Sequence, residues 1–282
     1  MRLLFLGDVY GRPGREAVIA RVPELRRELD LDFVVANGEN AAGGFGITAE
    51  ICREFYAAGV DAITTGNHAW DQREIIGYID SDPRLLRPQN YPPGTPGRGL
   101  AVFDLPAGRR VVVIQVMLQL FMPTLDDPFA AIEQALAPYP LGRSAHAIVL
   151  DLHGEATSEK MALAHFVDGR VSMAVGSHTH IPTADWQILP KGTAYQTDAG
   201  MCGNYDSVIG LAKAQAIEKF VRKLPVGRIE PEPGEATLCG LFVETEDASG
   251  LALRAEPLRL GGALVPHRPV GGRDLGRAQR MA

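Results

Sequence analysis

Three short stretches decide the fold: RLLFLGD at residues 2–8, FVVANGEN at 33–40 and DAITTGNH at 61–68. Each contains a run of apolar residues, which predicts a buried strand, and each ends in Gly beside acidic, amide or imidazole side chains. The predicted strands are Leu3–Leu6, Phe33–Ala36 and Asp61–Thr64.

The segments between these strands have helical spacing. Gly14–Leu29 places three apolar residues on one face. Thr48–Ala58 begins with a good N-cap residue and is followed by Gly59, a common helix stop. Repetition of strand and helix predicts right-handed βαβ units and a parallel sheet, which binds its ligands at the carboxyl ends of the strands.

The rest of the chain indicates a mixed sheet system and therefore an α/β fold. Asp71 and Glu74 have the spacing of a capping box for a following helix. Leu100–Leu105 and Val111–Met117 are expected to pair across a Pro-Ala-Gly turn. Further strands are predicted at Ala147–Leu150, Val171–Val175, Thr237–Glu244 and Leu251–Leu260, and helices at Asp127–Leu136 and Ala212–Val221.

We expect three parts along the chain. Residues 1–202 and 235–262 form the main domain, and 203–234 form a small helical cap inserted into it. Residues 263–282 are rich in Gly and Arg and are expected to be a mobile tail.

Composition excludes several classes of protein. The 282 residues are 46% hydrophobic and 22% charged, which is ordinary for a globular protein. A net charge of −6 argues against a general nucleic-acid binder. The three cysteines Cys52, Cys202 and Cys239 form no CxxC pair, and no apolar run is long enough for a signal peptide or a membrane span. We therefore expect a cytoplasmic protein with no membrane partner.

The polar residues at the predicted strand ends are potential metal ligands. Their carboxylate, amide and imidazole groups together suit iron, manganese or zinc better than magnesium or calcium. A carboxylate can bridge two ions about 3.5–4 Å apart, as in two-metal hydrolases. The candidate ligands are Asp8, Glu39, Asn40, Asn67, His153, His178 and His180.

Taken singly, each of these residues has an ordinary structural explanation. Asp8 could cap a helix, Asn67 could occupy a turn, and His153 could be a core histidine. His178 and His180 would share one face in a regular strand, whereas a loop leaves their directions open. Their repetition at successive strand ends nevertheless favours a shared site.

The order of these motifs resembles the calcineurin-like metallophosphoesterase superfamily, and more closely its bacterial YmdB-like branch. Tyr10 stands where the superfamily usually has a metal-binding histidine, and Glu39 where it has a bridging aspartate; the branch shares both departures. The resemblance covers about residues 2–260 and rests on Gly-Asp-Val-Tyr-Gly at 7–11, Gly-Glu-Asn at 38–40, GNHAWDQRE at 66–74, HGEATSEK at 153–160 and His-Thr-His at 178–180.

This resemblance implies a four-layer fold, a mixed β-sheet sandwich flanked by helices with a small helical cap. It also implies two divalent or trivalent metal ions per chain, with iron first and manganese or zinc as alternatives. One ion would be held by Asp8, Glu39, His180 and, in place of the missing ligand, Asn40. The other would be held by Glu39, Asn67, His153 and His178. His68 corresponds to the histidine that contacts the phosphate and protonates the leaving oxygen.

The implied activity is hydrolysis of cyclic nucleotides, 2′,3′-cyclic AMP in particular, by attack of a metal-bound hydroxide with His68 as general acid. Tyr10, Phe45 and Trp70 are candidates for contacting the base. Thr157 and Ser158 suit a helix start, and Lys160 suits a solvated helix face.

Two alternatives stay open on the sequence alone, and a homo-oligomer is compatible with either. One is a phosphomonoesterase or protein phosphatase. The other is a non-catalytic, RNA-associated regulatory protein with a structural metal site. The support for an RNA-associated protein is the basic tail, with Arg268, Arg273, Arg277 and Arg280 against Asp274.

Overall fold

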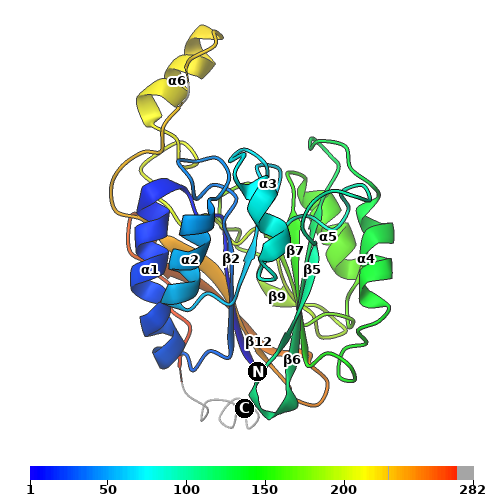
Figure 1. The fold of residues 1–282 in the computed structure, drawn as a ribbon. Helices are drawn as coiled ribbons and strands as arrows, with labels where there is room; N and C mark the ends of the chain where they lie inside the picture. Colours follow the sequence, from blue (N-terminus) through cyan, green and yellow to red (C-terminus); the bar gives the residue numbers. More distant parts are fainter. Residues whose placement is uncertain (228, 272–282) are drawn as a thin grey trace.

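Two six-stranded mixed sheets face each other in the computed structural model, which describes residues 1–227 and 229–271 (Figure 1). In the first sheet β1 to β4 pair in parallel, and β11 and β12 extend it antiparallel. Its order is β12 (Ala252–Leu260), β11 (Leu238–Thr245), β1 (Arg2–Leu6), β2 (Phe33–Asn37), β3 (Ala62–Thr64) and β4 (Leu85–Leu86).

The second sheet is also mixed, but its antiparallel strands lie at both edges. Its central strands β6, β7, β8 and β10 are parallel, and an antiparallel strand closes each edge. Its order is β5 (Leu100–Asp104), β6 (Arg110–Met117), β7 (Ala147–His153), β8 (Met173–Ser177), β10 (Ala194–Gln196) and β9 (Gln187–Ile188).

Helices cover the outer face of each sheet, as Figure 1 shows, with α1 and α2 on one side and α4 and α5 on the other. The expected four layers are therefore confirmed. The helices are α1 (Gly11–Glu28), α2 (Ala49–Ala58), α3 (Ile75–Tyr78), α4 (Pro128–Leu136), α5 (Thr157–Phe166) and α6 (Lys213–Arg222), with short 3₁₀ turns at Ile79–Ser81 and Pro106–Gly108.

Strand β1 illustrates why apolar runs, rather than alternating patterns, mark these strands. Leu4 and Leu6 pack with the helices of the first outer layer, whereas Leu3 and Phe5 point into the core between the two sheets. Because both faces of the strand are buried, every position from Leu3 to Leu6 is apolar. The same arrangement carries each parallel strand to one edge of the sandwich, where the polar clusters begin.

Most of the predicted elements are present, but the capping box is wrong. Thr48 caps α2 by accepting from the amide of Ile51, and Gly59 ends that helix in the left-handed region. Asp71 caps no helix, since α3 starts only at Ile75 and has no side-chain cap. The predicted helix after Asp71 is reduced to this single turn, which leaves Asp71 available for another role.

The predicted cap segment leaves and re-enters the main domain at one place. Gly203 and Thr237 exchange backbone hydrogen bonds of 3.0 and 2.9 Å, so the chain between them is an excursion. Helix α6, within this excursion, stands apart from the sandwich in Figure 1. The division at 203–234 stays a prediction.

The predicted tail begins with ordered contacts. His267 and Arg259 exchange backbone hydrogen bonds of 2.8 and 2.9 Å, which ties this part of the tail to β12. Residues 272–282, with Arg273, Arg277 and Arg280, lie outside the described residues. Among the helices that the structure describes, none combines the length and apolar character needed to cross a membrane.

Candidate metal centre

Five parallel strands deliver the predicted ligands to one edge of the sandwich. Asp8 follows β1, Glu39 follows β2 and Asn67 follows β3 in the first sheet, while His153 ends β7 and His178 follows β8 in the second. Asn40 directly follows Glu39, and His180 lies two residues after His178. All seven candidate ligands therefore come together where the carboxyl ends of the two sheets meet.

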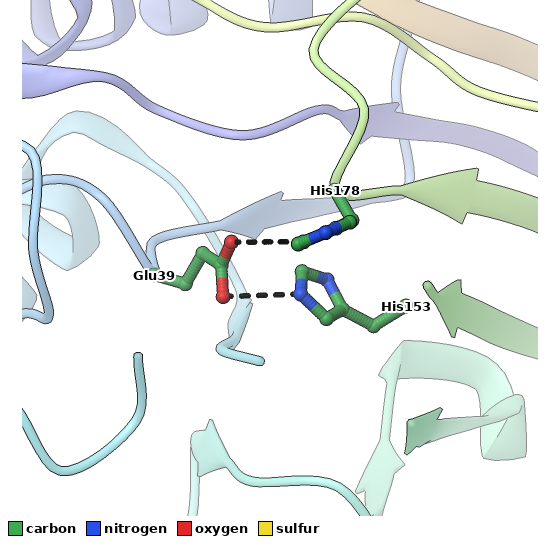
Figure 2. A group of neighbouring side chains, drawn as sticks. All are labelled: Glu39, His153 and His178. Carbon is green, nitrogen blue, oxygen red and sulfur yellow. Dashed lines mark ion pairs between the residues drawn. The ribbon is translucent and has the colours of Figure 1, made fainter. Parts of the chain in front are cut away.

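Glu39 lies at the centre of this cluster. Its Oε2 is 3.1 Å from His153 Nε2, and its Oε1 is 4.0 Å from His178 Nδ1. Figure 2 shows the carboxylate directed at both imidazole rings. These three residues offer ligand atoms within 4.8 Å of one another, and so does a second group, Asp8, Glu39 and His180. Glu39 is the member that the two groups share.

The amides complete these groups. Asn67 Oδ1 lies 2.9 Å from His153 Nε2. Asn40 Oδ1 lies 3.2 Å from His180 Nε2, while the Asn40 amide group donates to the carbonyl of Gly44. Tyr10, at the position of the superfamily's histidine, packs edge-on against His180 with ring centroids 5.3 Å apart.

Charges in the cluster interact strongly because it is buried. Burial raises the pKa of Glu39, but attraction to His153 outweighs it and brings the value to about 2. Burial lowers the pKa of His153, and attraction to Glu39 again outweighs it and raises the value to about 9. Burial and then repulsion by His153 lower the pKa of His178 to about 3. Burial, with the charge of Glu39 second, raises the pKa of Asp8.

The donor atoms fit a bound cation. His180 Nδ1 donates to the Ile209 carbonyl at 2.7 Å, so in the neutral ring Nε2 carries no proton. The lone pair of Nε2 therefore faces another acceptor, Oδ1 of Asn40. His178 Nδ1 is buried and has no hydrogen-bond partner among the described residues. A cation between such lone pairs satisfies atoms that otherwise oppose one another.

Gly66 leaves the space that such a cation requires. A Cβ atom built on Gly66 would clash with Glu39 Oε2 and with Nε2 and Cε1 of His153. Only glycine keeps this position open, since any other residue would fill the gap between the carboxylate and the imidazole.

The segment with His178 and His180 is a loop, so the strand geometry that would place both rings on one face does not apply. Strand β8 ends at Ser177, and the φ angles of His178 and His180 are 97° and 68°. Non-glycine residues rarely adopt such angles, and they persist where the surroundings enforce them.

A buried ion pair supplies that constraint, and it corrects the expectation that Lys160 is solvated. Lys160 is fully buried, and its Nζ donates to Asp198 at 2.9 Å and to the Ser177 carbonyl at 2.8 Å. Asp198 Oδ2 also accepts from the amide and hydroxyl of Thr179. The Lys160–Asp198 pair thereby fixes the backbone at Ser177 and Thr179, on both sides of His178.

We expect Lys160→Met to lower the free energy of unfolding by about 3–5 kcal/mol, because Asp198 would be left buried without a partner. Urea unfolding of the metal-free protein measures this. Lys213→Met is the matched control, since the Lys213–Asp206 pair at 2.7 Å is largely exposed and should contribute only about 0–1 kcal/mol. Equal losses in the two variants would contradict the structural role of Lys160.

His68 lies beside the cluster and is anchored by a residue that sequence reasoning missed. Its Nδ1 is 2.8 Å from Asp71 Oδ2, and its ring packs edge-on against Phe45 at 5.2 Å. The capping-box interpretation of Asp71 overlooks this contact. Its spacing from His68, three residues on in a turn, is the signal in the sequence that could have found it.

A cavity of about 700 Å³ opens above the cluster. Its lining includes Glu39, His68, His178 and His180 from the cluster, together with Ile209, Leu211 and Ile229 from the segment 203–234. Tyr10 and Phe45 also line it, as expected for the aromatic candidates. Trp70, the third candidate, packs against Tyr91 instead, with ring centroids 5.8 Å apart.

Known proteins resemble this chain along most of its length. A family model described as "YmdB-like protein" matches residues 4–258. A 2′,3′-cyclic-nucleotide 2′-phosphodiesterase from Bacillus subtilis is 44% identical over 256 residues, which cover 91% of this chain and 96% of the relative. A putative phosphatase/phosphodiesterase from Mycoplasma genitalium is 31% identical, with 92% and 93% covered.

Solved structures agree. A hypothetical protein from Thermus thermophilus superposes with a TM-score of 0.86 at 41% identity, covering 93% of this chain and all of the other. A protein from Mycoplasma pneumoniae, described as a novel phosphatase, superposes with a TM-score of 0.85 at 31% identity, covering 93% of each chain. The motif resemblance is thus confirmed, and the chain belongs to the YmdB-like family.

Proposed function

We propose that this chain is a dinuclear-metal phosphodiesterase that hydrolyses 2′,3′-cyclic nucleotides. The observation that carries the proposal is the position of Glu39 in two donor groups at once, which is the arrangement of a carboxylate that bridges two ions. The name of the Bacillus subtilis relative supports the choice of substrate.

The proposed ligands follow the two donor groups. Asp8, Glu39 and His180 would hold one ion, with Asn40 beside them. Glu39, His153 and His178 would hold the other, with Asn67 beside them. Bound metal ions of this kind supply an activated water and neutralise charge on the phosphoryl oxygens. The mixed oxygen and nitrogen donors favour iron, manganese or zinc.

The protein's own residues would handle the proton of the leaving group. In the proposed reaction water adds to phosphorus, the bond from phosphorus to the 2′ oxygen breaks, and a 3′-phosphate monoester remains. The departing 2′ oxygen needs a proton. Asp71 binds Nδ1 of His68, which leaves Nε2 as the nitrogen to carry that proton.

The cavity offers room for the nucleoside. Phe45 and Tyr10 are aromatic surfaces on which a base can pack, and Ile209 and Leu211, from the segment 203–234, add apolar surface to the same cavity. We infer that the phosphate lies against the metal cluster while the base packs on the aromatic and apolar part of this lining.

A panel of substrates tests the proposal. Metal-loaded protein is expected to hydrolyse 2′,3′-cyclic AMP and bis-p-nitrophenyl phosphate in preference to p-nitrophenyl phosphate. A monoester preference would favour the second candidate, a phosphatase, which the names of the Mycoplasma relatives support. If neither class of ester were hydrolysed after loading with iron, manganese or zinc, the enzymatic proposal would be wrong.

Metal affinity is expected to weaken as the pH falls below about 9. His153 has a raised pKa of about 9 in the metal-free protein, so below that pH an incoming ion has to displace a proton from the ring. Each displaced proton should weaken binding about tenfold per pH unit. Competition with a chelator between pH 6.5 and 9.5 measures the slope, and constant affinity across this range would contradict the assignment of His153.

His68→Ala is expected to slow hydrolysis of 2′,3′-cyclic AMP by about 10²–10⁴-fold, the usual contribution of a general acid. Hydrolysis of bis-p-nitrophenyl phosphate should suffer much less, because p-nitrophenolate leaves without a proton. His165→Ala, an exposed histidine on α5, serves as the control with unchanged rates. Equal losses on both substrates would assign His68 to binding rather than to proton transfer.

A further inference from the structure

A buried polar network lies directly beneath the candidate metal centre. Asp151, on β7 two residues before His153, is completely buried. Its Oδ2 accepts from the Thr64 hydroxyl at 2.6 Å, from Gln115 Nε2 at 2.9 Å and from Asn37 Nδ2 at 3.2 Å. Its Oδ1 accepts from the Ser177 hydroxyl at 2.6 Å. Residues from both sheets therefore converge on one carboxylate.

The direction of these hydrogen bonds is set by the backbone. Asn37 Oδ1 accepts from the amide of Glu39 at 3.0 Å, and Gln115 Oε1 accepts from the amide of Thr65 at 3.1 Å. Each side-chain amide must therefore turn its NH₂ group toward Asp151. Asp151 thus accepts four hydrogen bonds, three at Oδ2 and one at Oδ1, and donated hydrogen bonds of this kind stabilise a carboxylate.

Ser177 links Asp151 to His153 of the metal centre, and the direction of its hydrogen bond to Asp151 decides how it binds His153. Its single hydroxyl proton goes to Asp151, so its oxygen can only accept from its other neighbours. Those neighbours are His153 Nδ1 at 2.8 Å and Asn37 Nδ2 at 3.3 Å. His153 must consequently carry a proton on Nδ1, and the nitrogen that faces Glu39 and Asn67 is Nε2.

We propose that Ser177 and Asp151 are positioning residues that hold the proton on His153 Nδ1, so that Nε2 is the nitrogen available to a metal ion. The inference rests on the metal site of the proposed function. Hydrogen bonds of this kind fix the tautomer and orientation of metal-binding histidines, and their loss commonly costs 10–100-fold in metal affinity.

His180 shows why the carboxylate is needed behind the serine. His180 Nδ1 donates to a backbone carbonyl, that of Ile209, which can only accept and so fixes the tautomer alone. A hydroxyl can both donate and accept. Ser177 would leave the tautomer of His153 open unless Asp151 took its proton, and the buried network ensures that it does.

We call the chain of hydrogen bonds from Asp151 through Ser177 to His153 Nδ1 the relay. Two variants test it at different points. Ser177→Ala removes the acceptor for His153 Nδ1. Asp151→Asn keeps every side chain's size: the amide oxygen can replace Oδ2 toward Thr64, Gln115 and Asn37, while the amide NH₂ then donates to Ser177. The Ser177 proton would turn to His153 Nδ1 and drive the ring proton to Nε2, toward the metal position.

Ser172→Ala is the matched control. Ser172 is equally buried, immediately precedes β8, and uses its hydroxyl only to accept from the Ile148 amide at 3.0 Å among the hydrogen bonds found in the described residues. Ser177 is at the opposite end of the same strand. The control thus removes a comparable hydrogen bond without touching a histidine.

Two measurements are made on each full-length protein. Zinc affinity is obtained by competition with a chelator, and the ¹⁵N shifts of the His153 ring are recorded in metal-free protein at a pH where the ring is neutral. We expect both variants to bind one zinc about 10–100-fold more weakly. We also expect Ser177→Ala to populate both tautomers and Asp151→Asn to move the proton to Nε2. Ser172→Ala should match the wild type.

Wild-type zinc affinity and an unchanged Nδ1 proton in either folded variant would overturn the relay. If Ser177→Ala failed to fold, the near-isosteric Asp151→Asn would decide alone. If the wild type bound no zinc, the metal site would be wrong, and the tautomer of His153 would still decide whether Ser177 and Asp151 control its proton.

Discussion

The Glu39→Gln variant is expected to lose both metal ions and on the order of 10³-fold in kcat. Glu39 is only 1% exposed and is the member common to both donor groups. An uncharged amide supplies one weaker oxygen, and its NH₂ group would face a cation or His153. Elemental analysis of the purified variant and turnover of 2′,3′-cyclic AMP measure the two losses.

The matched control is Glu54→Gln, the same chemical change on an exposed position of α2. It should retain both ions and full turnover. The contrast matters because glutamine keeps the size of the side chain, so a folded Glu39→Gln protein isolates the charge. Two ions per chain with normal turnover in that protein would remove Glu39 from the centre of the site.

The location of the candidate site could be predicted because it depends on local sequence. Parallel strands buried on both faces need continuous apolar runs, as in Leu3–Leu6, and the chain turns polar where such a strand leaves the core. Asp8, Glu39 and Asn67 are each found just after such a run. The division of the strands between two facing sheets followed only from the family resemblance.

The roles of the residues that support the site could not be predicted from the sequence, because they depend on contacts between residues far apart in the chain. Lys160 has the spacing of an ordinary helix residue, and only the approach of Asp198, 38 positions away, makes its burial tolerable. Asp151 and Ser177 are ordinary strand residues by sequence. Their hydrogen bonds to each other and to side chains of the first sheet are visible only in the fold. Asp71 was misassigned since a capping box and a turn that orients His68 share the same short spacing.

Gly66→Ala is expected to prevent metal binding between Glu39 and His153 and to cost on the order of 10²-fold or more in kcat, the usual effect of displacing reacting groups by about 1 Å. The added methyl group would overlap the carboxylate of Glu39 and the ring of His153. Neither side chain can withdraw easily: His153 is held by Ser177 at 2.8 Å, and both are buried.

Gly77→Ala separates this effect from the general cost of replacing a glycine. Gly77 lies in α3 with nothing within 4 Å of an added Cβ, so alanine there should stabilise the helix by roughly 0.5–1 kcal/mol and leave metal content unchanged. Elemental analysis, turnover and thermal unfolding of the two variants distinguish the cases. Because the methyl group at Gly66 removes no ligand, a loss of metal there would locate the ion between Glu39 and His153, whereas normal metal content and turnover would exclude that position.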